Sequence, residues 1–249
     1  MKARMWILGM VLTMFAAGSA FAGNVSINFG GSESLGTARQ PFLSGAVVVY
    51  GYECGASDAT TGATLTNCMP STLAEKMDGP SETGLGLEGE GGGENEIGFD
   101  GANADFLLGL DVSGLLKLGA TSMTLSFGSV QPGEAYAILG YGSNPFVAGS
   151  FTLDNTNTKA FVGNDGSTTS QIFSSTFSLN ADDQFLVILS PCAFAGNPAD
   201  KNGPCGGNVL LGSLSSNVPT PEPGTLALFA TGLLALGFGM RRRFAFQRQ

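Results

Sequence analysis

Histidine is absent from the 249 residues of this chain, and several other residue types are scarce. Without histidine the chain has no Ser-His-Asp or Cys-His catalytic group and no His-ligated metal site. Charged residues make up 12% of the sequence, against about 25% in an average globular protein. We therefore expect that the protein is not an enzyme. A secreted glycan-active hydrolase, which needs only two carboxylates, is the least favoured alternative.

Basic residues are also scarce between residues 23 and 220. This segment holds five basic residues against 19 acidic ones, a formal charge of −14. Such a surface repels nucleic acid and anionic lipid, and it attracts divalent cations or basic partners. We therefore expect no nucleic-acid partner.

The first 22 residues have the order of a secretory signal peptide. A basic start is followed by an apolar stretch, and Ala20 and Ala22 place small residues two apart before Gly23. An uncleaved N-terminal membrane anchor is the alternative, but the Ala-x-Ala ending favours cleavage after Ala22. We expect the mature chain to begin near Gly23, outside the cytoplasm.

Short apolar blocks separated by turn residues fill the segment 23–217. Met123, Leu125 and Phe127 alternate with small or polar residues, the period of a half-buried strand. The pattern predicts an all-β fold, an antiparallel β-sandwich or jelly-roll-like ectodomain. A short helix within 107–118 and a weaker helix candidate at 73–77 are alternatives. The predicted strands are 41–52, 105–112, 121–130, 134–141, 145–153, 171–179 and 184–190.

The four cysteines favour an exported, oxidised domain. Cys54 and Cys68 are 14 residues apart, Cys192 and Cys205 are 13 apart, and both intervals are rich in loop-forming residues. Of the three possible connectivities we predict local pairing, Cys54–Cys68 and Cys192–Cys205. A thiolate metal site is the rival interpretation, but it lacks a close Cys-x-x-Cys pair and any histidine.

An acidic, glycine-rich stretch covers residues 84–105. Carboxylates in a flexible loop suit Ca²⁺, and Glu94, Glu96 and Asp100 are the candidate ligands. A solvated acidic loop is the simpler interpretation and ranks first, because no EF-hand pattern is present. We expect no cofactor, with a structural Ca²⁺ as a hypothesis.

Two tyrosines suggest a second binding hypothesis. Tyr50 and Tyr52 are two apart in a predicted strand and therefore share a face, where they would suit a sugar platform. The single tryptophan, Trp6, lies within the predicted signal peptide. Packing at the edge of the core is the commoner fate of strand tyrosines. A Ca²⁺-assisted carbohydrate-binding module is thus the alternative function.

Residues 218–249 combine three features in a fixed order. These are the tripeptide Pro221, Glu222 and Pro223, the uncharged 17-residue run 224–240, and Arg241, Arg242 and Arg243. As a helix the run would be about 25 Å long, slightly short of a hydrocarbon core of about 30 Å. Three arginines would hold the C-terminus in the cytoplasm. We expect a single C-terminal transmembrane helix; a core helix is disfavoured because no domain follows for it to pack against.

This order at the end of the chain resembles the PEP-CTERM sorting signal. The resemblance implies processing by an exosortase, a membrane-embedded cysteine transpeptidase-like enzyme of exopolysaccharide-producing Gram-negative bacteria. It also implies that residues 221–223 are the recognition motif, 224–240 the membrane span and 241–243 the retention signal. We expect a single-pass membrane intermediate that reaches the cell surface or the extracellular matrix. There it would have a structural or adhesive role associated with exopolysaccharide and biofilm.

Overall fold

The structure is a computed structural model of the whole chain. It describes residues 23–30, 35–55, 64–77, 82–89, 96–98, 104–131, 134–148, 151–152, 157–163, 171–189, 209–218 and 231–232. The chain divides into two compact units, Asn24–Val218, here called the body, and a second unit made of Met1–Gly23 with Pro219–Gln249. Nearly all described residues belong to the body.

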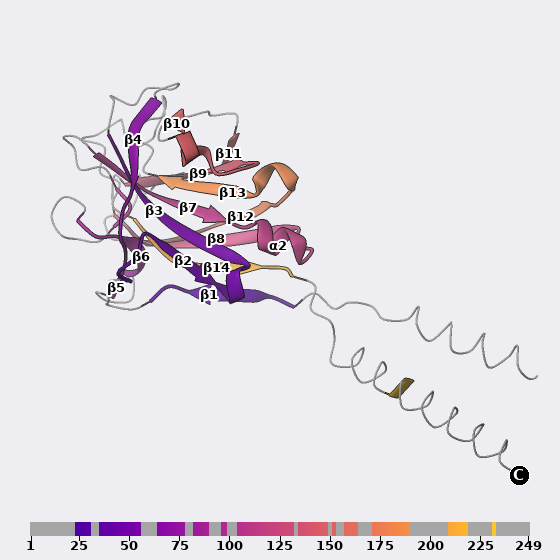
Figure 1. Cartoon of the computed structure of the whole chain (residues 1–249). Coiled ribbons are helices and arrows are strands. Elements are labelled where there is room, and N and C mark those ends of the chain that lie inside the picture. The colour runs from indigo at the N-terminus through magenta and orange to yellow at the C-terminus, as the bar shows by residue number, and fades with distance from the viewer. Residues whose placement is uncertain are drawn as a thin grey trace, which may run out of the picture. The chain divides into compact units, whose positions relative to one another are not determined.

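Two antiparallel sheets form the body (Figure 1). The six-stranded sheet contains, in spatial order, β12 (Gln171–Ser178), β8 (Ser122–Val130), β14 (Leu210–Ser216), β6 (Thr83–Leu87) and β5 (Leu73–Met77), with β1 (Val25–Asn28) also paired to β14. The eight-stranded sheet contains β10 (Phe151–Thr152), β4 (Thr64–Pro70), β3 (Val47–Gly55), β7 (Ala104–Asp111), β13 (Phe185–Leu189), β9 (Ala135–Tyr141) and β11 (Thr158–Gly163), with β2 (Arg39–Phe42) paired to β3.

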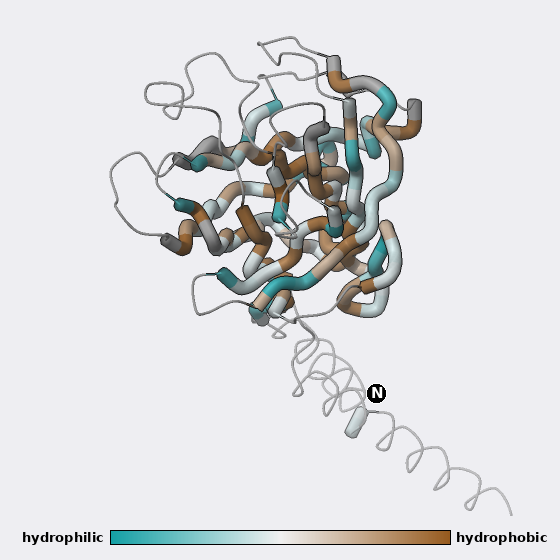
Figure 2. Tube along the Cα trace, turned by 90° about the vertical axis from the view of Figure 1, so that its left-hand side faces the viewer, coloured by the Kyte–Doolittle hydropathy of each residue, from teal (hydrophilic) through white to brown (hydrophobic). Residues whose placement is uncertain are grey.

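The main core lies between the two sheets. Alternate residues of each strand point into it, so Leu125 and Phe127 of β8 are fully buried, as the alternation of that segment predicted. The rings of Phe127 and Tyr136 stack with centroids 3.9 Å apart, which joins the six-stranded sheet to the eight-stranded one. Hydrophobic positions concentrate inside the body, and paler ones lie along its surface (Figure 2). The predicted all-β, antiparallel, sandwich-like fold is confirmed.

A buried ion pair lies where β11 and β9 meet the turn before β13. Asp183, in the 3₁₀ turn η4 (Ala181–Asp183), has a side chain with no exposed surface, and its Oδ1 lies 2.5 Å from Lys159 Nζ. Gly140 of β9 lies beneath the pair, and a Cβ there would be 2.5 Å from Lys159 Cε and too close to Asp183. The missing side chain at Gly140 therefore makes room for the pair.

The predicted strand 41–52 is interrupted by a tight turn. The turn η1 (Leu43–Gly45) separates β2 from β3, and its three residues have φ of 50°, 56° and 88°. Positive φ is strained for Leu43 and Ser44 but not for Gly45. The turn was missed because Leu-Ser-Gly sits inside an otherwise continuous apolar run.

Two other segments differ from the prediction. Within the predicted strand 145–153, residues 145–148 form the 3₁₀ turn η2 (Pro145–Ala148) and residues 151–152 form β10, because Asn144 Oδ1 accepts a hydrogen bond from Phe146 N and closes the chain into a turn. Residues 73–77, a weaker helix candidate, are strand β5. The alternative of a short helix within 107–118 is confirmed by α2 (Ser113–Lys117), which follows β7.

The first and last strands of the body lie side by side. Val25 of β1 pairs with Ser216 of β14, so the chain enters and leaves the body at the same end of the six-stranded sheet. The neighbouring strand β8 also begins at this end, because Met123 pairs with Ser216.

Candidate functional site

An aromatic cluster covers the outer face of the eight-stranded sheet. Tyr50 and Tyr52 of β3 stack with ring centroids 6.2 Å apart, which confirms that they share a face. The ring of Tyr52 also stacks on Phe146 of η2 at 4.1 Å, and Tyr50 lies 5.8 Å from Phe185 of β13. The rings therefore cover one another, and Tyr52 is 8% exposed.

Polar groups close the remaining sides of this cluster. The guanidinium of Arg39 lies 5.7 Å from the Tyr50 ring centroid, and its Nε donates to Tyr50 Oη at 3.3 Å. Asn144 Nδ2 donates to Tyr52 Oη at 2.9 Å. Burial raises the pKa of Tyr52, and the hydrogen bond from Asn144 opposes that rise. The arrangement is a packed edge of the core rather than an open sugar platform, which favours the simpler of the two sequence interpretations.

A glycine in β7 allows the aromatic cluster to pack directly against the sheet. Gly109 of β7 pairs with Tyr50, and a Cβ at this position would lie 2.6 Å from Phe185 Cζ and 3.1 Å from Tyr52 Cε2. The two rings thus occupy the space that any other residue would fill.

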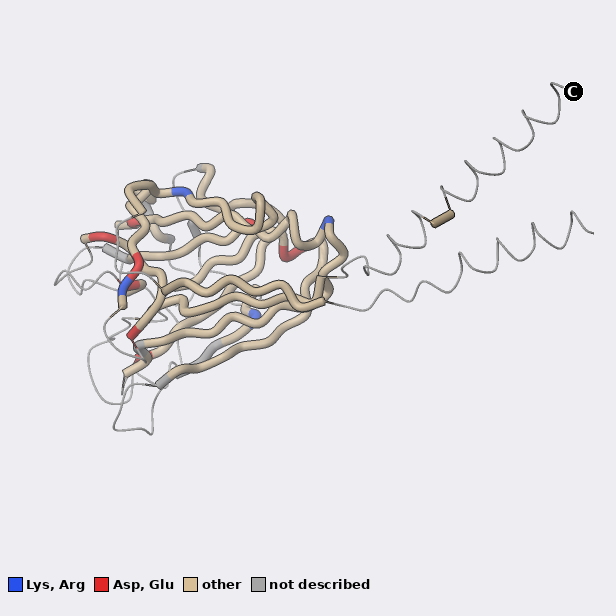
Figure 3. The backbone as a smooth tube through the Cα atoms, turned by 90° about the horizontal axis from the view of Figure 1, so that it is seen from below, with Lys and Arg blue, Asp and Glu red and all other residues tan. Residues whose placement is uncertain are grey.

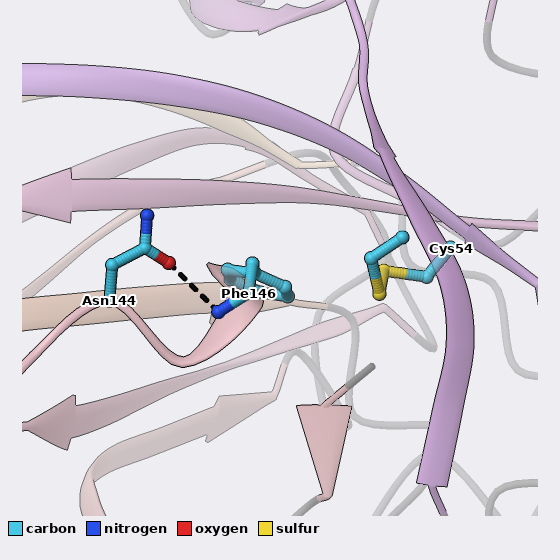
Figure 4. Close-up of a disulfide and its surroundings, with 4 residues drawn as sticks. Cys54, Asn144 and Phe146 are labelled. Atoms are coloured by element: carbon cyan, nitrogen blue, oxygen red, sulfur yellow. Dashed lines mark hydrogen bonds between the residues drawn. A yellow bond between two sulfur atoms is a disulfide. The ribbon is translucent and has the colours of Figure 1, made fainter. Parts of the chain in front are cut away.

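The predicted Cys54–Cys68 disulfide is confirmed. Cys54 of β3 and Cys68 of β4 are bonded with Sγ–Sγ 2.05 Å and Cα–Cα 4.0 Å, and both are buried. The turn that carries Asn144 and Phe146 lies beside this bond (Figure 4). The predicted Cys192–Cys205 pair lies outside the described residues.

The acidic stretch is described only in part. Glu96 has no exposed side-chain surface, and its Oε1 accepts a hydrogen bond from Lys76 Nζ at 2.9 Å. Glu82 is 3.9 Å from the same ammonium. The other candidate Ca²⁺ ligands, Glu94 and Asp100, lie outside the described residues, and among those described no group of three acidic or cysteine side chains is placed to hold a metal. The calcium site stays a hypothesis.

A neutral, hydroxyl-bearing surface lies on the outer face of four strands of the six-stranded sheet. We call it the hydroxyl face and define it by ten outward residues of β1, β14, β8 and β12 that carry a hydroxyl or amide group. It has nine serines or threonines and one asparagine, and no charged residue. Its members are Ser26, Asn28, Ser213, Ser215, Ser122, Thr124, Ser126, Ser174, Thr176 and Ser178.

Side chains of the hydroxyl face are paired across the strands. Thr124 Oγ1 lies 2.7 Å from Thr176 Oγ1, and Ser126 Oγ lies 2.7 Å from Ser174 Oγ. One row of the face crosses four strands, because Thr124 also pairs with Ser215, which pairs with Ser26. Charged positions in the body gather near strand ends, and the strands between them are uncharged over long stretches (Figure 3).

The predicted processing residues lie outside the described part of the chain. These are Ala20 and Ala22 of the signal peptide, Pro221, Glu222 and Pro223, and Arg241, Arg242 and Arg243. Among the described residues, none forms a helix that is both long and apolar enough to cross a membrane. Only Thr231 and Gly232 of the expected span 224–240 are described, and the transmembrane helix remains a prediction.

Comparison with known families addresses the tail directly. Residues 219–243 match the family model of the PEP-CTERM protein-sorting motif. The chain carries a PEP-CTERM sorting motif. The match begins directly after Val218, the last residue of the body, and includes the tripeptide, the uncharged run and all three arginines. The PEP-CTERM resemblance recognised in the sequence is therefore confirmed.

Several solved structures are similar to this chain at low sequence identity. One is a cleaved adhesin domain of Lys-gingipain, which is 13% identical over 78% of this chain and 95% of that chain, with a TM-score of 0.31. Another cleaved adhesin domain of Lys-gingipain, from Porphyromonas gingivalis, is 10% identical over 78% of this chain and 99% of that chain, with a TM-score of 0.30. A carbohydrate-binding module from Cellvibrio mixtus lichenase 5A, solved with cellotriose, is 10% identical over 78% of this chain and 95% of that chain, with a TM-score of 0.22. TM-scores this low carry no argument about a ligand. No curated protein matches the chain.

Proposed function

We propose that this protein is an exported component of the cell surface or extracellular matrix of a Gram-negative bacterium. A signal peptide over residues 1–22 starts export, and a span at residues 224–240 holds the chain briefly in the membrane. An exosortase-type enzyme then processes the tail. The body has a structural or adhesive role associated with exopolysaccharide.

The observation that carries the proposal is the PEP-CTERM motif at residues 219–243, which follows the sandwich-like body directly in the sequence. Glu222 lies between two prolines in the sequence, and prolines disfavour a continuing helix, so we expect the motif to be extended and accessible to the enzyme. The Cys54–Cys68 disulfide supports the exported location, because such bonds persist in oxidising compartments.

A non-enzymatic role agrees with the described surface. The tyrosines pack against one another, and Glu96 is engaged by Lys76. A Ca²⁺-assisted carbohydrate-binding module would need Glu94 and Asp100 as ligands together with others, so that alternative is weaker than a passive or adhesive matrix role.

The test is the intact mass and cell fraction of the protein in its native host, beside a Glu222→Ala variant. Wild-type protein should lose its tail near residues 221–224 and leave the membrane fraction. The Glu222→Ala variant should keep residues up to Gln249 and stay in the membrane fraction. Glu88→Ala, which removes an exposed carboxylate from the body, is the matched control and should be processed like wild type.

A wild-type chain that still ends at Gln249 in the membrane fraction would contradict the proposal. The tail would then be a permanent anchor. Equal processing of Glu222→Ala and wild type would show that the tripeptide is not the recognition element.

A further inference from the structure

Among the described residues, the hydroxyl face is the less covered of the two outer sheet faces. On the outer face of the eight-stranded sheet, Phe146 of η2 and Leu65 of β4 lie in the same buried cluster as Tyr52. On the six-stranded sheet, by contrast, the side chains of Ser174, Thr176 and Ser178 on β12 are exposed, as is Ser26 on β1.

We infer that the hydroxyl face is the surface that contacts a neutral polysaccharide. This inference rests on the proposed role in an exopolysaccharide matrix, and it names the contact surface and the chemical class of the ligand.

The absence of charged residues on the hydroxyl face favours an uncharged ligand. The segment 23–220 carries a formal charge of −14, yet the hydroxyl face has no charged residue. A polyanion such as nucleic acid or a polyuronate needs lysine or arginine to offset its charge, and the face offers none. A polycation would be drawn to the acidic positions elsewhere on the body. The face therefore suits a partner without charge.

Among uncharged ligands, the hydrogen-bonding groups of the hydroxyl face favour a polysaccharide. A hydroxyl donates one hydrogen bond and accepts two, so each Thr124–Thr176 or Ser126–Ser174 pair keeps donor and acceptor capacity for a ligand. The same pairs orient the side chains before binding, and serine and threonine lose little rotamer freedom on contact. A polysaccharide presents the matching array, since its own hydroxyls are also both donors and acceptors.

Other occupants fit the face less well. A protein partner or a second copy of this chain would need an apolar centre with aromatic or arginine anchors, and the ten residues of the hydroxyl face include neither. Ile172 continues the outward row of β12 beyond Ser174 and is 59% exposed. One apolar side chain at the border suits the C–H groups of a sugar ring, but it is too little for a dimer interface.

Binding on such a face should be weak per contact and depend on many contacts. Each protein–sugar hydrogen bond replaces bonds to water, so its net contribution is small. Rows of hydroxyls that cross four strands allow one extended chain to make several such contacts at once. Long polymers should therefore bind measurably where short oligosaccharides do not.

The test uses protein released from the native host, run in native gels that contain a polysaccharide. The neutral probes are hydroxyethyl cellulose, galactomannan and the neutral fraction of the host exopolysaccharide. The anionic probes are alginate and the acidic fraction. Wild-type protein should be retarded by the neutral host fraction and not by alginate.

Two kinds of variant test the face itself. Thr124→Val with Thr176→Val removes one hydroxyl pair with little change of shape and should weaken retardation by about fivefold. Thr176→Lys places a long charged side chain on the face and should weaken it by about tenfold or more. Ser143→Lys, an exposed serine outside the face, is the charge-matched control and should bind like wild type. Thermal unfolding must match that of wild type in every variant.

Three results would overturn the inference. They are no retardation of wild type by any neutral probe, stronger retardation by the anionic probes, and face variants that bind like wild type. Sedimentation showing a wild-type dimer that Thr176→Lys abolishes, without retardation, would assign the face to a second copy instead.

The amount of protein that co-isolates with exopolysaccharide from cells separates this inference from the proposed function. If wild type and the face variants co-isolate equally, the matrix role stands and the hydroxyl face is not the contact. If wild type does not co-isolate but still binds neutral probes through the face, the inference stands and the matrix role fails.

Discussion

Replacing Lys159 by methionine should lower the free energy of unfolding by about 3–5 kcal/mol. Asp183 has no exposed side-chain surface, and among the described residues its carboxylate is paired with Lys159 Nζ. Without the lysine, a carboxylate stays buried beside Gly140 with no compensating charge. Asp183→Asn should cost less, about 1–3 kcal/mol, because Lys159 is 25% exposed and its ammonium can turn to water.

Urea unfolding of the exported protein, followed by circular dichroism, measures both losses. The double variant should lose less than the sum of the single variants, because the two groups act on each other. Lys117→Met and Asp182→Asn alter exposed charges and should each change stability by less than about 0.5 kcal/mol. If Lys159→Met unfolds at the same urea concentration as Lys117→Met, the buried pair does not stabilise the body and the reasoning is wrong.

Three further perturbations test other parts of the body. Cys54→Ala with Cys68→Ala should lower the free energy of unfolding by about 3 kcal/mol, because the bond closes a loop of 14-residue separation, and urea unfolding measures the loss. Gly109→Ala should cost about 1–3 kcal/mol in the same assay, because its methyl group would displace the ring of Phe185. Burial raises the pKa of Tyr136, so stability should fall as the pH rises from about 10, the unfolded value, towards the raised folded value. A pH series of thermal unfolding should show this fall for wild type and a shallower one for Tyr136→Phe.

Each of these three predictions has a control or an outcome that would contradict it. Reducing agent should destabilise wild type more than the Cys54/Cys68 variant if this bond carries the effect. Gly142→Ala, where a Cβ would contact nothing within 4 Å, should be nearly neutral. At pH 7 Tyr136→Phe should be less stable than wild type, because the buried Ser175 hydroxyl loses its partner at 3.0 Å. Equal alkaline sensitivity of both proteins would show that the pKa of Tyr136 is not raised by folding.

Strong local patterns made part of the fold predictable. The alternation of Met123, Leu125 and Phe127 predicted β8, and the apolar blocks predicted β7, β9, β12 and β13 to within a few residues. Strands β1, β4, β5, β6, β11 and β14 were missed. Strand β1 has four residues, and β6, Thr-Gly-Leu-Gly-Leu, has glycines where polar alternates would stand.

The candidate surfaces could not be predicted from short stretches of sequence, because they depend on which strands are neighbours in the sheets. The serines and threonines that alternate in β8, β12 and β14 are visible in the sequence, but they form one face only because these strands are neighbours. That order joins segments from opposite ends of the body, as in the Val25–Ser216 pair. The aromatic cluster was missed as a packed unit for the same reason, since Phe146 and Phe185 reach Tyr52 and Tyr50 from distant turns and strands.

The position of β14 has a mechanical consequence. This strand leads into the sorting tail and is hydrogen-bonded to β8 along one side and to β1 and β6 along the other. A pull at Val218 along the strand would load these hydrogen bonds in shear, so that many must break together before β14 can leave the sheet. A pull across the sheet would instead open them one at a time. While the tail still holds it, a body tethered through its last strand therefore resists drag along the direction of β14, and single-molecule extension from Val218 should require a larger unfolding force than peeling from β12.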